Sequence, residues 1–440
     1  MKHTMAICGL LAWPGALAMA QETPAPVPAA GGSGALASGY VTRDEYNKLQ
    51  SKLDAAVLEM QQSKKDQTLT NADVDKTIEE MQADLAKNHR LVDDLHLGTT
   101  KFLVTGDGAV GFTSQRKSDS TFSAGFAPLF LFELDKKLLF EGALDIAGGT
   151  SPDDQSSTSV DLKLANLTYL VNDNLFIGGG LFAVPFGRYH THFDPSWIDK
   201  LPDDPLVFGD RAIAPGSETG FFAGGSVPVS TTKVEYNAYV TNGPNLNVSS
   251  PDQAGSLNFD DYTDLNNGKA VGGRLGFLPT PEFDFGYSVQ YSNPTPRGFD
   301  HDIHALLQGV DATYKAQVEA LQGTLETRVE WVWSKVDKAT YDVGAGPFTF
   351  NNNRNGGYVL LAYRPTMVDN KVLKNLEFVF RYDKISVSQD APGGGDESRY
   401  TFGVDYWLTP AVVLKVAYQV DEKQVGPDQN VFFVQCGFGL

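Results

Sequence analysis

The sequence predicts an all-β transmembrane antiparallel β-barrel of about 16 strands, preceded by an α-helical coiled-coil segment. Three observations favour this fold class. Apolar and polar residues alternate with a period of two from Gly98 onward, and the connections between the predicted strands alternate between short and long. No apolar run after residue 20 approaches the roughly 20 residues that a membrane helix needs. A membrane protein with such a sequence must therefore be a barrel, because a closed sheet leaves no backbone group unpaired in lipid.

Residues 1–20 have the composition of a secretory signal peptide. Lys2 gives a weakly basic start, an apolar stretch covers residues 5–17, and "LAMA" (17–20) offers an A-x-A cleavage site. Cleavage there would leave Cys436 as the one cysteine of the mature chain. One cysteine forms no internal disulfide, and by itself it gives little support for a zinc site or a catalytic thiol.

Residues 21–41 and 42–97 are expected to be a flexible linker and a helical coiled coil in the periplasm. The first segment is rich in Pro, Ala, Gly and Ser. The second begins with a capping box, Thr42 and Glu45, and has no Pro or Gly. Its apolar residues recur at spacings of three and four, as in a coiled coil. The alternative is a single amphipathic helix packed on the main domain. The residues of the seam are Leu53, Val57, Met60, Val74, Ile78, Met81, Leu85, Val92 and Leu95.

Residues 98–440 are expected to form the barrel. In residues 399–408, for example, Phe402 and Val404 face one way, whereas Thr401 and Asp405 face the other. The predicted strands start near Lys101, Thr121, Leu138, Val160, Leu175, Thr219, Lys233, Ala270, Glu282, Ala305, Val318, Gly357, Leu376, Arg399, Val412 and Val431.

The lengths of the connections distinguish an outer-membrane barrel from a large soluble β-domain, which is the alternative fold. Every second connection is mostly tight: 135–137, 171–174, 229–232, 279–282 and 408–411. The others are longer and polar: 188–217, 243–268, 292–303, 335–352 and 389–398. Short turns on one rim and long loops on the other are typical of outer-membrane barrels.

One face of the predicted strands is apolar and aromatic, and we expect it to contact lipid. The other face would line the lumen, where 16 strands leave an aqueous channel rather than a packed core. Acids outnumber bases on this inner face, which would raise the local cation concentration and favour cations mildly. The alternative is that the charges form balanced pairs. The predicted lumen residues are Asp107, Glu141, Asp145, Asp161, Lys163, Glu235, Arg274, Asp284, Glu326, Arg328, Glu330, Glu377, Arg381, Asp383, Asp405 and Lys415.

Other kinds of site have little support in the sequence. His190, His192 and Asp194 would share one side of an extended segment and are weak candidates for a metal or ferric chelate, so no metal and no cofactor is predicted. "GDGAVG" (106–111) lies inside the first strand and opens no helix, so it is not a dinucleotide site. No G-x-S-x-G motif occurs, and the protein is not expected to be an enzyme. The net charge of −19 argues against nucleic acid as a partner.

The order of signal peptide, coiled coil and barrel resembles that of outer-membrane porins with 16 strands. Phe438 and Leu440 resemble the C-terminal signal read by the barrel-assembly machinery, although porins often end in Phe. The last strand would pair back to the first near Lys101. In such porins the loop after the fifth strand folds into the barrel, which implies a constriction formed by residues 188–217. Its charged residues are Asp194, Asp199, Lys200, Asp203, Asp204, Asp210 and Arg211.

The segment "WIDKLPDDPL" (197–206) together with the N-terminal helix resembles siderophore porins of the legiobactin-receptor type. This resemblance implies passive uptake of small hydrophilic solutes or of a ferric siderophore across a bacterial outer membrane. Outer-membrane lipid and the assembly machinery would be partners, and the chain would form a homotrimer. The alternative is a structural envelope protein, in which the coiled coil tethers the barrel to the cell wall or gathers three barrels.

Overall fold

The structure is a computed structural model. It describes residues 101–116, 120–150, 156–209, 212–248, 250, 253–259, 266–299, 301–342, 346–392 and 394–440, and the single residues 51, 52, 54, 55 and 58, which are helical. The predicted signal peptide, linker and, apart from those five residues, coiled coil lie outside the described residues. None of the described residues belongs to a helix long and apolar enough to cross a membrane.

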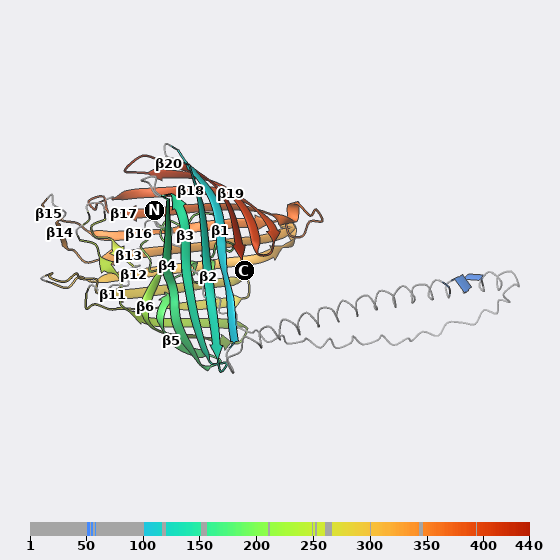
Figure 1. Ribbon diagram of the computed structural model, residues 1–440, viewed down its shortest axis with the longest axis horizontal. Helices are drawn as coiled ribbons and strands as arrows, with labels where there is room; N and C mark the ends of the chain where they lie inside the picture. Colours follow the sequence, from blue (N-terminus) through green and yellow to red (C-terminus); the bar gives the residue numbers. More distant parts are fainter. Residues whose placement is uncertain are drawn as a thin grey trace, which may run out of the picture. The chain divides into compact units, whose positions relative to one another are not determined.

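Sixteen antiparallel strands form one closed barrel, and β20 pairs with β1 to close it. The strands of the near and far walls cross each other in Figure 1, because strands in a closed barrel are tilted. The barrel strands are β1 (Lys101–Gln115), β2 (Thr121–Leu134), β3 (Leu138–Thr150), β4 (Ser156–Asn172), β5 (Leu175–Ala183), β6 (Ser217–Val229), β7 (Thr232–Thr241), β10 (Ala270–Thr280), β11 (Phe283–Ser292), β12 (Ala305–Val318), β13 (Gly323–Val336), β16 (Asn352–Arg364), β17 (Leu376–Val387), β18 (Gly395–Thr409), β19 (Val412–Lys423) and β20 (Gln429–Gly439).

The predicted number and order of strands are confirmed, and most strands start within one or two residues of the expected position. The start of β13 was placed too early, at Val318, because residues Glu319–Leu321 form the 3₁₀ turn η2. The closing contact also differs from the expectation. β20 pairs with residues from Asp107 to Gln115, not with those near Lys101, because neighbouring strands in a barrel are staggered.

Most connections alternate in length as expected, but the connection 365–375 is longer than the next one, 388–394, because it contains the 3₁₀ turn η3 (Leu373–Asn375). In the three-residue connection between β2 and β3, Asp135 and Lys136 have φ values of 50° and 59°, as the central residues of a tight type I′ turn require. Two of the long loops contain small hairpins that the sequence did not predict. β8 (Asn245–Leu246) pairs with β9 (Leu257–Asn258), and β14 (Thr340–Asp342) pairs with β15 (Pro347–Thr349).

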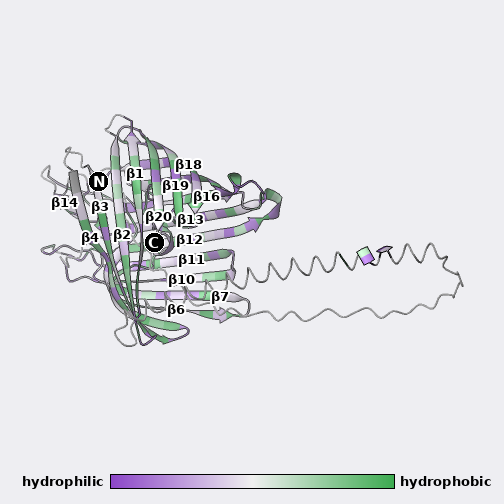
Figure 2. Cartoon of the chain, turned by 45° about the vertical axis from the view of Figure 1, so that its right-hand side comes forward, coloured by the Kyte–Doolittle hydropathy of each residue, from purple (hydrophilic) through white to green (hydrophobic). Residues whose placement is uncertain are grey.

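The outer surface of the barrel is apolar. Hydrophobic and hydrophilic residues alternate along the strands (Figure 2), and large side chains such as Phe122 and Phe221 are 74% and 72% exposed. In β18 the alternation is the predicted one: Phe402 is exposed, whereas Thr401 and Asp405 are buried.

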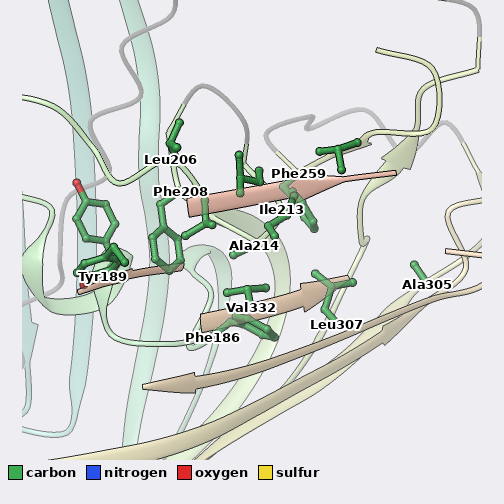
Figure 3. Close-up of a cluster of buried hydrophobic side chains, with 14 of the residues drawn as sticks. Phe186, Tyr189, Leu206, Phe208, Ile213, Ala214, Phe259, Ala305, Leu307 and Val332 are labelled. Carbon is green, nitrogen blue, oxygen red and sulfur yellow. The ribbon is translucent and has the colours of Figure 1, made fainter. Parts of the chain in front are cut away.

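The interior contains a packed apolar cluster, which the expectation of a purely polar inner face did not include. Phe186, Phe208 and Ile213, from the connection between β5 and β6, pack against Leu307 of β12 and wall residues beside it (Figure 3). The connection that fills this part of the barrel is the candidate functional site.

Candidate functional site

The connection between β5 and β6 lies inside the barrel over its described residues, 184–209 and 212–216, and we call it the inner loop. Val184 and Leu206 are fully buried, and Tyr189 is 1% exposed. Buried side chains of this size are unusual in surface loops. Polar contacts fix the loop to several strands that are remote from it in sequence. The loop therefore divides the interior of the barrel.

One part of the inner loop is attached where the barrel closes, at β1 and β20. The Ser196 amide donates to Asp107 Oδ2 (2.7 Å), and its hydroxyl donates to the carbonyl of Gly108 (2.9 Å). Glycines in β20 make this approach possible. A Cβ atom on Gly437 would lie 2.6 Å from the Ser196 carbonyl oxygen, and one on Gly439 would lie 2.6 Å from the Trp197 indole nitrogen.

A second part is attached to the opposite wall. The Gly187 amide donates to Ser288 Oγ of β11, and the Arg188 amide donates to Glu330 Oε2 of β13, each over 3.0 Å. Gly187 has a φ of +71°, and a Cβ atom there would clash with the Glu330 carboxylate. Glycine is therefore required for both conformation and space.

Prolines start two turns that shape the middle of the loop. The amides of Ile198 and Asp199 donate to the Pro195 carbonyl, over 2.8 and 2.9 Å. The amides of Phe208 and Gly209 donate to the Pro205 carbonyl, each over 2.9 Å. Proline favours such turns because its φ is already close to the value that a turn needs.

Ion pairs hold the central residues of the loop. Lys200 Nζ lies 2.8 Å from Glu377 Oε1 and 3.6 Å from Glu326 Oε2. Arg381, which is fully buried, donates to Asp203 Oδ2 (2.9 Å) and to Asp383 Oδ2 (2.7 Å). Buried charges need such partners, because removing one of them leaves the other charge unpaired away from water.

A further network surrounds Arg188. Its guanidinium bonds Glu235 (2.6 Å) and also contacts Asp284. Arg274 of β10 donates to both oxygens of Asp311 and lies 3.4 Å from Asp284. The sequence did not single out Arg188 or Asp311. Arg188 could have been identified as a charged residue of the long connection, and Asp311 as an acid on the inner face of β12.

Tyr189 joins two carboxyl groups of the loop. Its hydroxyl lies 2.7 Å from Asp204 Oδ1 and 3.1 Å from Asp199 Oδ2. Burial raises the pKa of Asp204 to about 7, and the charges of Asp199 and Asp203 add to this effect. Burial also raises the pKa of Asp199, and raises that of Asp194 well above its ordinary value.

The predicted extended segment with His190 and His192 is instead one π-helical turn, η1 (Tyr189–Phe193). In a helix, residues two apart do not share a side, so the two imidazoles separate. His192 Nε2 bonds Arg188 (2.9 Å), whereas His190 Nδ1 lies 3.9 Å from Asp194 Oδ1. Burial lowers the pKa of each histidine to about 3, so both are neutral. The described residues contain no cluster of ligands suited to a metal ion.

The structure brings most of the predicted site residues together at the inner loop. Asp194, Asp199, Asp203 and Asp204 lie in the loop, whereas Asp210 and Arg211 lie outside the described residues. Eleven of the predicted lumen residues are at most 4% exposed: Asp107, Asp145, Arg274, Glu326, Arg328, Glu330, Glu377, Arg381, Asp383, Asp405 and Lys415. Arg328 pairs with Glu326, and Lys415 donates to the Ser196 carbonyl (2.6 Å). The wall charges thus bind the loop as well as each other.

The barrel fold is shared with solved outer-membrane porins. OmpF of Salmonella typhi, in a complex with daunomycin, matches with a TM-score of 0.53 and 14% identity, over 78% of this chain and 98% of that chain. An anion-selective porin from Comamonas acidovorans matches with a TM-score of 0.49 and 11% identity, over 78% and 100% of the two chains. The outer-membrane channel DcaP of Acinetobacter baumannii also gives a TM-score of 0.49 and 11% identity, over 78% and 99%. No family model and no curated protein matches the sequence, so the siderophore-porin resemblance stays a prediction.

Proposed function

We propose that this protein is a passive channel of a bacterial outer membrane, through which small hydrophilic solutes diffuse past the inner loop. One observation carries the proposal: a loop rich in charged residues lies inside a closed barrel and is fixed to opposite walls, by Ser196 at β1 and Arg188 at β13. Such a loop narrows the lumen and presents charge to a passing solute.

The outer surface supports the location in a membrane. Phe402, in the middle of β18, is 55% exposed, and Phe221 of β6 is 72% exposed. Exposed apolar side chains on a closed sheet suit lipid, because every strand already has its hydrogen-bonding partners. Outer-membrane lipid and the barrel-assembly machinery are then the partners of the chain.

A mild preference for cations follows from the charges of the interior. The bases near the inner loop are already engaged: Lys200 by two glutamates and Arg381 by two aspartates. Acids outnumber bases among the predicted lumen residues, and Asp161 of β4 is an exposed acid on the inner face. A surplus of negative charge attracts cations into a confined aqueous space.

Reversal potentials in a salt gradient across a planar bilayer test both the channel and its selectivity. We expect a cation-selective potential, and a decrease of roughly twofold in the cation-to-anion permeability ratio for the double variant Asp203→Asn, Asp204→Asn. Asp337→Asn is the matched control, because that side chain is 52% exposed. Absence of conductance would contradict the channel, and anion preference would contradict the charge assignment.

A ferric siderophore is the more specific candidate solute. It is supported by the resemblance of residues 197–206. Growth of a deletion strain on iron-limited medium, with and without added siderophore, tests this candidate. Unimpaired growth and uptake would leave the general channel as the function.

The predicted coiled coil supports the alternative role, in which residues 42–97 tether the barrel to the cell wall or gather three barrels. Deleting residues 41–97 distinguishes the two roles. A tether predicts that envelope attachment is lost while the pores still conduct. Cross-linking in native membranes would show whether the deletion also abolishes a homotrimer.

A further inference from the structure

Every barrel strand has a side chain on its inner face that is at most 9% exposed. We call these residues, one from each strand in order, the buried ring. They are Asp107, Ala127, Ala143, Leu164, Phe182, Glu218, Tyr239, Arg274, Ser288, Leu307, Glu330, Tyr358, Arg381, Thr401, Lys415 and Gln435. Because solvent reaches so little of these side chains, the space in front of them is filled by other parts of the chain.

Inward side chains on both sides of the buried ring are accessible. Toward the long loops, Ser159 and Asp161 of β4 are exposed. Toward the short turns, the side chains of Lys315 of β12 and Lys233 of β7 are 61% and 39% exposed. The barrel therefore has an accessible vestibule at each mouth, and the buried ring separates the two vestibules.

The inner loop crosses the lumen within the buried ring. A Cβ atom on Gly309 of β12 would lie 2.9 Å from the ring of Phe186. A Cβ atom on Gly403 of β18 would lie 2.7 Å from Leu201 Cδ2. Glycine at both positions lets the wall approach the loop closely. With Ser196 bonded to β1, the loop closes the barrel in this conformation and does more than narrow it.

Two charged anchors divide the inner loop. The guanidinium of Arg188 donates to Glu235 of β7 (2.6 Å), and Lys200 Nζ lies 2.8 Å from Glu377 of β17. Breaking either pair would leave a buried charge without its partner, which is strongly unfavourable. The loop therefore stays attached most firmly at these two residues.

Residues 189–199 lie between the anchors, and we call them the gate segment. Their bonds to the wall use neutral groups of the loop. The amide and hydroxyl of Ser196 donate to Asp107 and to the Gly108 carbonyl, and the Ile198 carbonyl accepts from Arg328 (3.3 Å). Hydrogen bonds of this kind contribute modestly, because water replaces the partner when they break. The gate segment can therefore leave the wall more easily than the anchors can.

Asp194, within the gate segment, makes the closed conformation less favourable. Its side chain is 0% exposed, and neither of its oxygens has a hydrogen-bond partner among the described residues. It interacts electrostatically with Lys163 of β4 and Asp107 of β1, so the gate segment faces these strands. A buried polar group without a hydrogen bond costs free energy. Movement of the segment into a vestibule would bring Asp194 to water and remove this cost.

We propose that the gate segment opens and closes the barrel. It closes the lumen when Ser196 is bonded to β1, and it opens the lumen by moving away from β1–β4 while Arg188 and Lys200 remain paired with the wall. The inference rests on the proposed channel function and specifies how the channel is regulated.

A disulfide between the gate segment and β1 tests the proposal. The Ser196 amide nitrogen lies 2.7 Å from Asp107 Oδ2, so the two residues are close enough to be linked. Asp107→Cys and Ser196→Cys are combined in a Cys436→Ala background. Thr113→Cys with Thr121→Cys is the matched control, because these residues are directly opposite each other on β1 and β2 and link only the wall. Mass spectrometry confirms each disulfide, and single-channel conductance is recorded in planar bilayers before and after reduction.

We expect the disulfide at Ser196 to lower the mean conductance at least ~10-fold, because it removes the open state, and reduction to restore it. The control disulfide should leave the conductance unchanged. A protein that conducts equally with and without the disulfide at Ser196 would overturn the gate. An equal loss of conductance in the control would do the same, since the wall would then be responsible.

Ser196→Ala tests the gate without a new covalent bond. It removes the hydroxyl bond to Gly108 and keeps the amide bond to Asp107, so the ratio of open to closed time should rise roughly 2- to 10-fold. Ser159→Ala, in the vestibule, should leave the ratio unchanged. An unchanged ratio in Ser196→Ala would contradict the gate. Wild-type protein that enters the bilayer and never conducts would instead contradict the proposed channel, whereas a steady conductance that the disulfide does not affect would contradict only the gate.

Discussion

At the scale of single residues, the protonation of a neighbouring carboxyl group determines which hydrogen bonds Tyr189 can form. The hydroxyl faces Asp204 at 2.7 Å and Asp199 at 3.1 Å, and it can donate to only one of them. Its contact with the other carboxyl group is favourable only when one of these two carboxyl groups is protonated. Burial favours this state, since it raises the pKa of Asp204 to about 7. The docking of the inner loop is therefore linked to pH.

We predict that the inner loop docks less tightly as the pH rises from 5 to 8. The folded pKa of Asp204 is about 7 and its ordinary value about 3.9, so the stabilisation by the proton is complete below pH ~4 and is lost as the pH rises through 7. Asp199, Asp203 and Arg381 also face this carboxyl group. Single-channel recordings should show a larger or more variable conductance at pH 8.

Asp204→Asn is the informative variant for this prediction, because an amide remains neutral at every pH tested. It should lose most of the pH dependence, and Asp337→Asn should retain it. An Asp204→Asn channel with the full pH dependence of the wild type would assign the effect to another group. Asp199 and Asp194 would be the next candidates, since burial raises the pKa of both.

At the scale of the elements, every second side chain of a barrel strand faces the outside. Phe402 is the eighth residue of β18, which spans Gly395–Thr409, and it is 55% exposed. Phe122 is the second residue of β2, next to the rim, and it is 74% exposed. The two phenylalanines are therefore equivalent in facing outward and differ in their distance from the rim.

We predict that Phe402→Lys destabilises the barrel in lipid by about 2–4 kcal/mol, whereas Phe122→Lys costs about 0–1 kcal/mol. A lysine in the middle of the strand would lie at the centre of the bilayer, far from water. Reversible unfolding of the protein in lipid vesicles with denaturant measures both values. Equal costs at the two positions would show that the strands are not placed across a bilayer in this way.

The sequence was sufficient for the strands because the alternation of side chains is local. It was not sufficient for the hairpins β8–β9 and β14–β15, whose strands have only two or three residues each. Nor did it predict η1, because the segment from Tyr189 to Phe193 has no helical pattern and is bent by its contacts with the wall. At the site, the aspartates of the loop were predicted because several of them occur close together in one connection. The buried hydroxyl of Tyr189 and the network of Arg188 depend on contacts between distant residues.

At the scale of the whole molecule, the interior has a packed side, formed by the large apolar cluster. The packed side joins segments that are far apart in the sequence: Phe186 of the inner loop, Phe259 after β9, and Phe350 after β15. Each lies in a connection that is polar overall, so the cluster cannot be recognised from any one segment. This is why the sequence predicted a polar inner face with a constriction loop and did not predict the apolar cluster.

We predict that Phe350→Ala opens the packed side. Phe350 is 4% exposed, and replacing a buried phenylalanine with alanine costs about 3–5 kcal/mol. Phe350 lies against Gly255 of the loop that contains β8 and β9, so this loop and the loop that contains β14 and β15 should then separate more often. Ser334 is 3% exposed, and labelling of Ser334→Cys with a methanethiosulfonate reagent should become several-fold faster, with larger fluctuations in conductance. Phe122→Ala, on the outer surface, is the control. Unchanged labelling in Phe350→Ala would mean that the cluster does not keep the loops closed.

The position of Ser196 and Trp197 has a consequence for the order in which the protein assembles. Ser196 bonds β1 and lies against Gly437, and Trp197 lies against Gly439, so the inner loop touches both sides of the seam between the first and last strands. Once β20 has joined β1, a loop still outside would have to be threaded into a finished cylinder. We therefore expect the loop to be in place before the seam closes, because a barrel without its loop lacks part of the surface against which β20 packs.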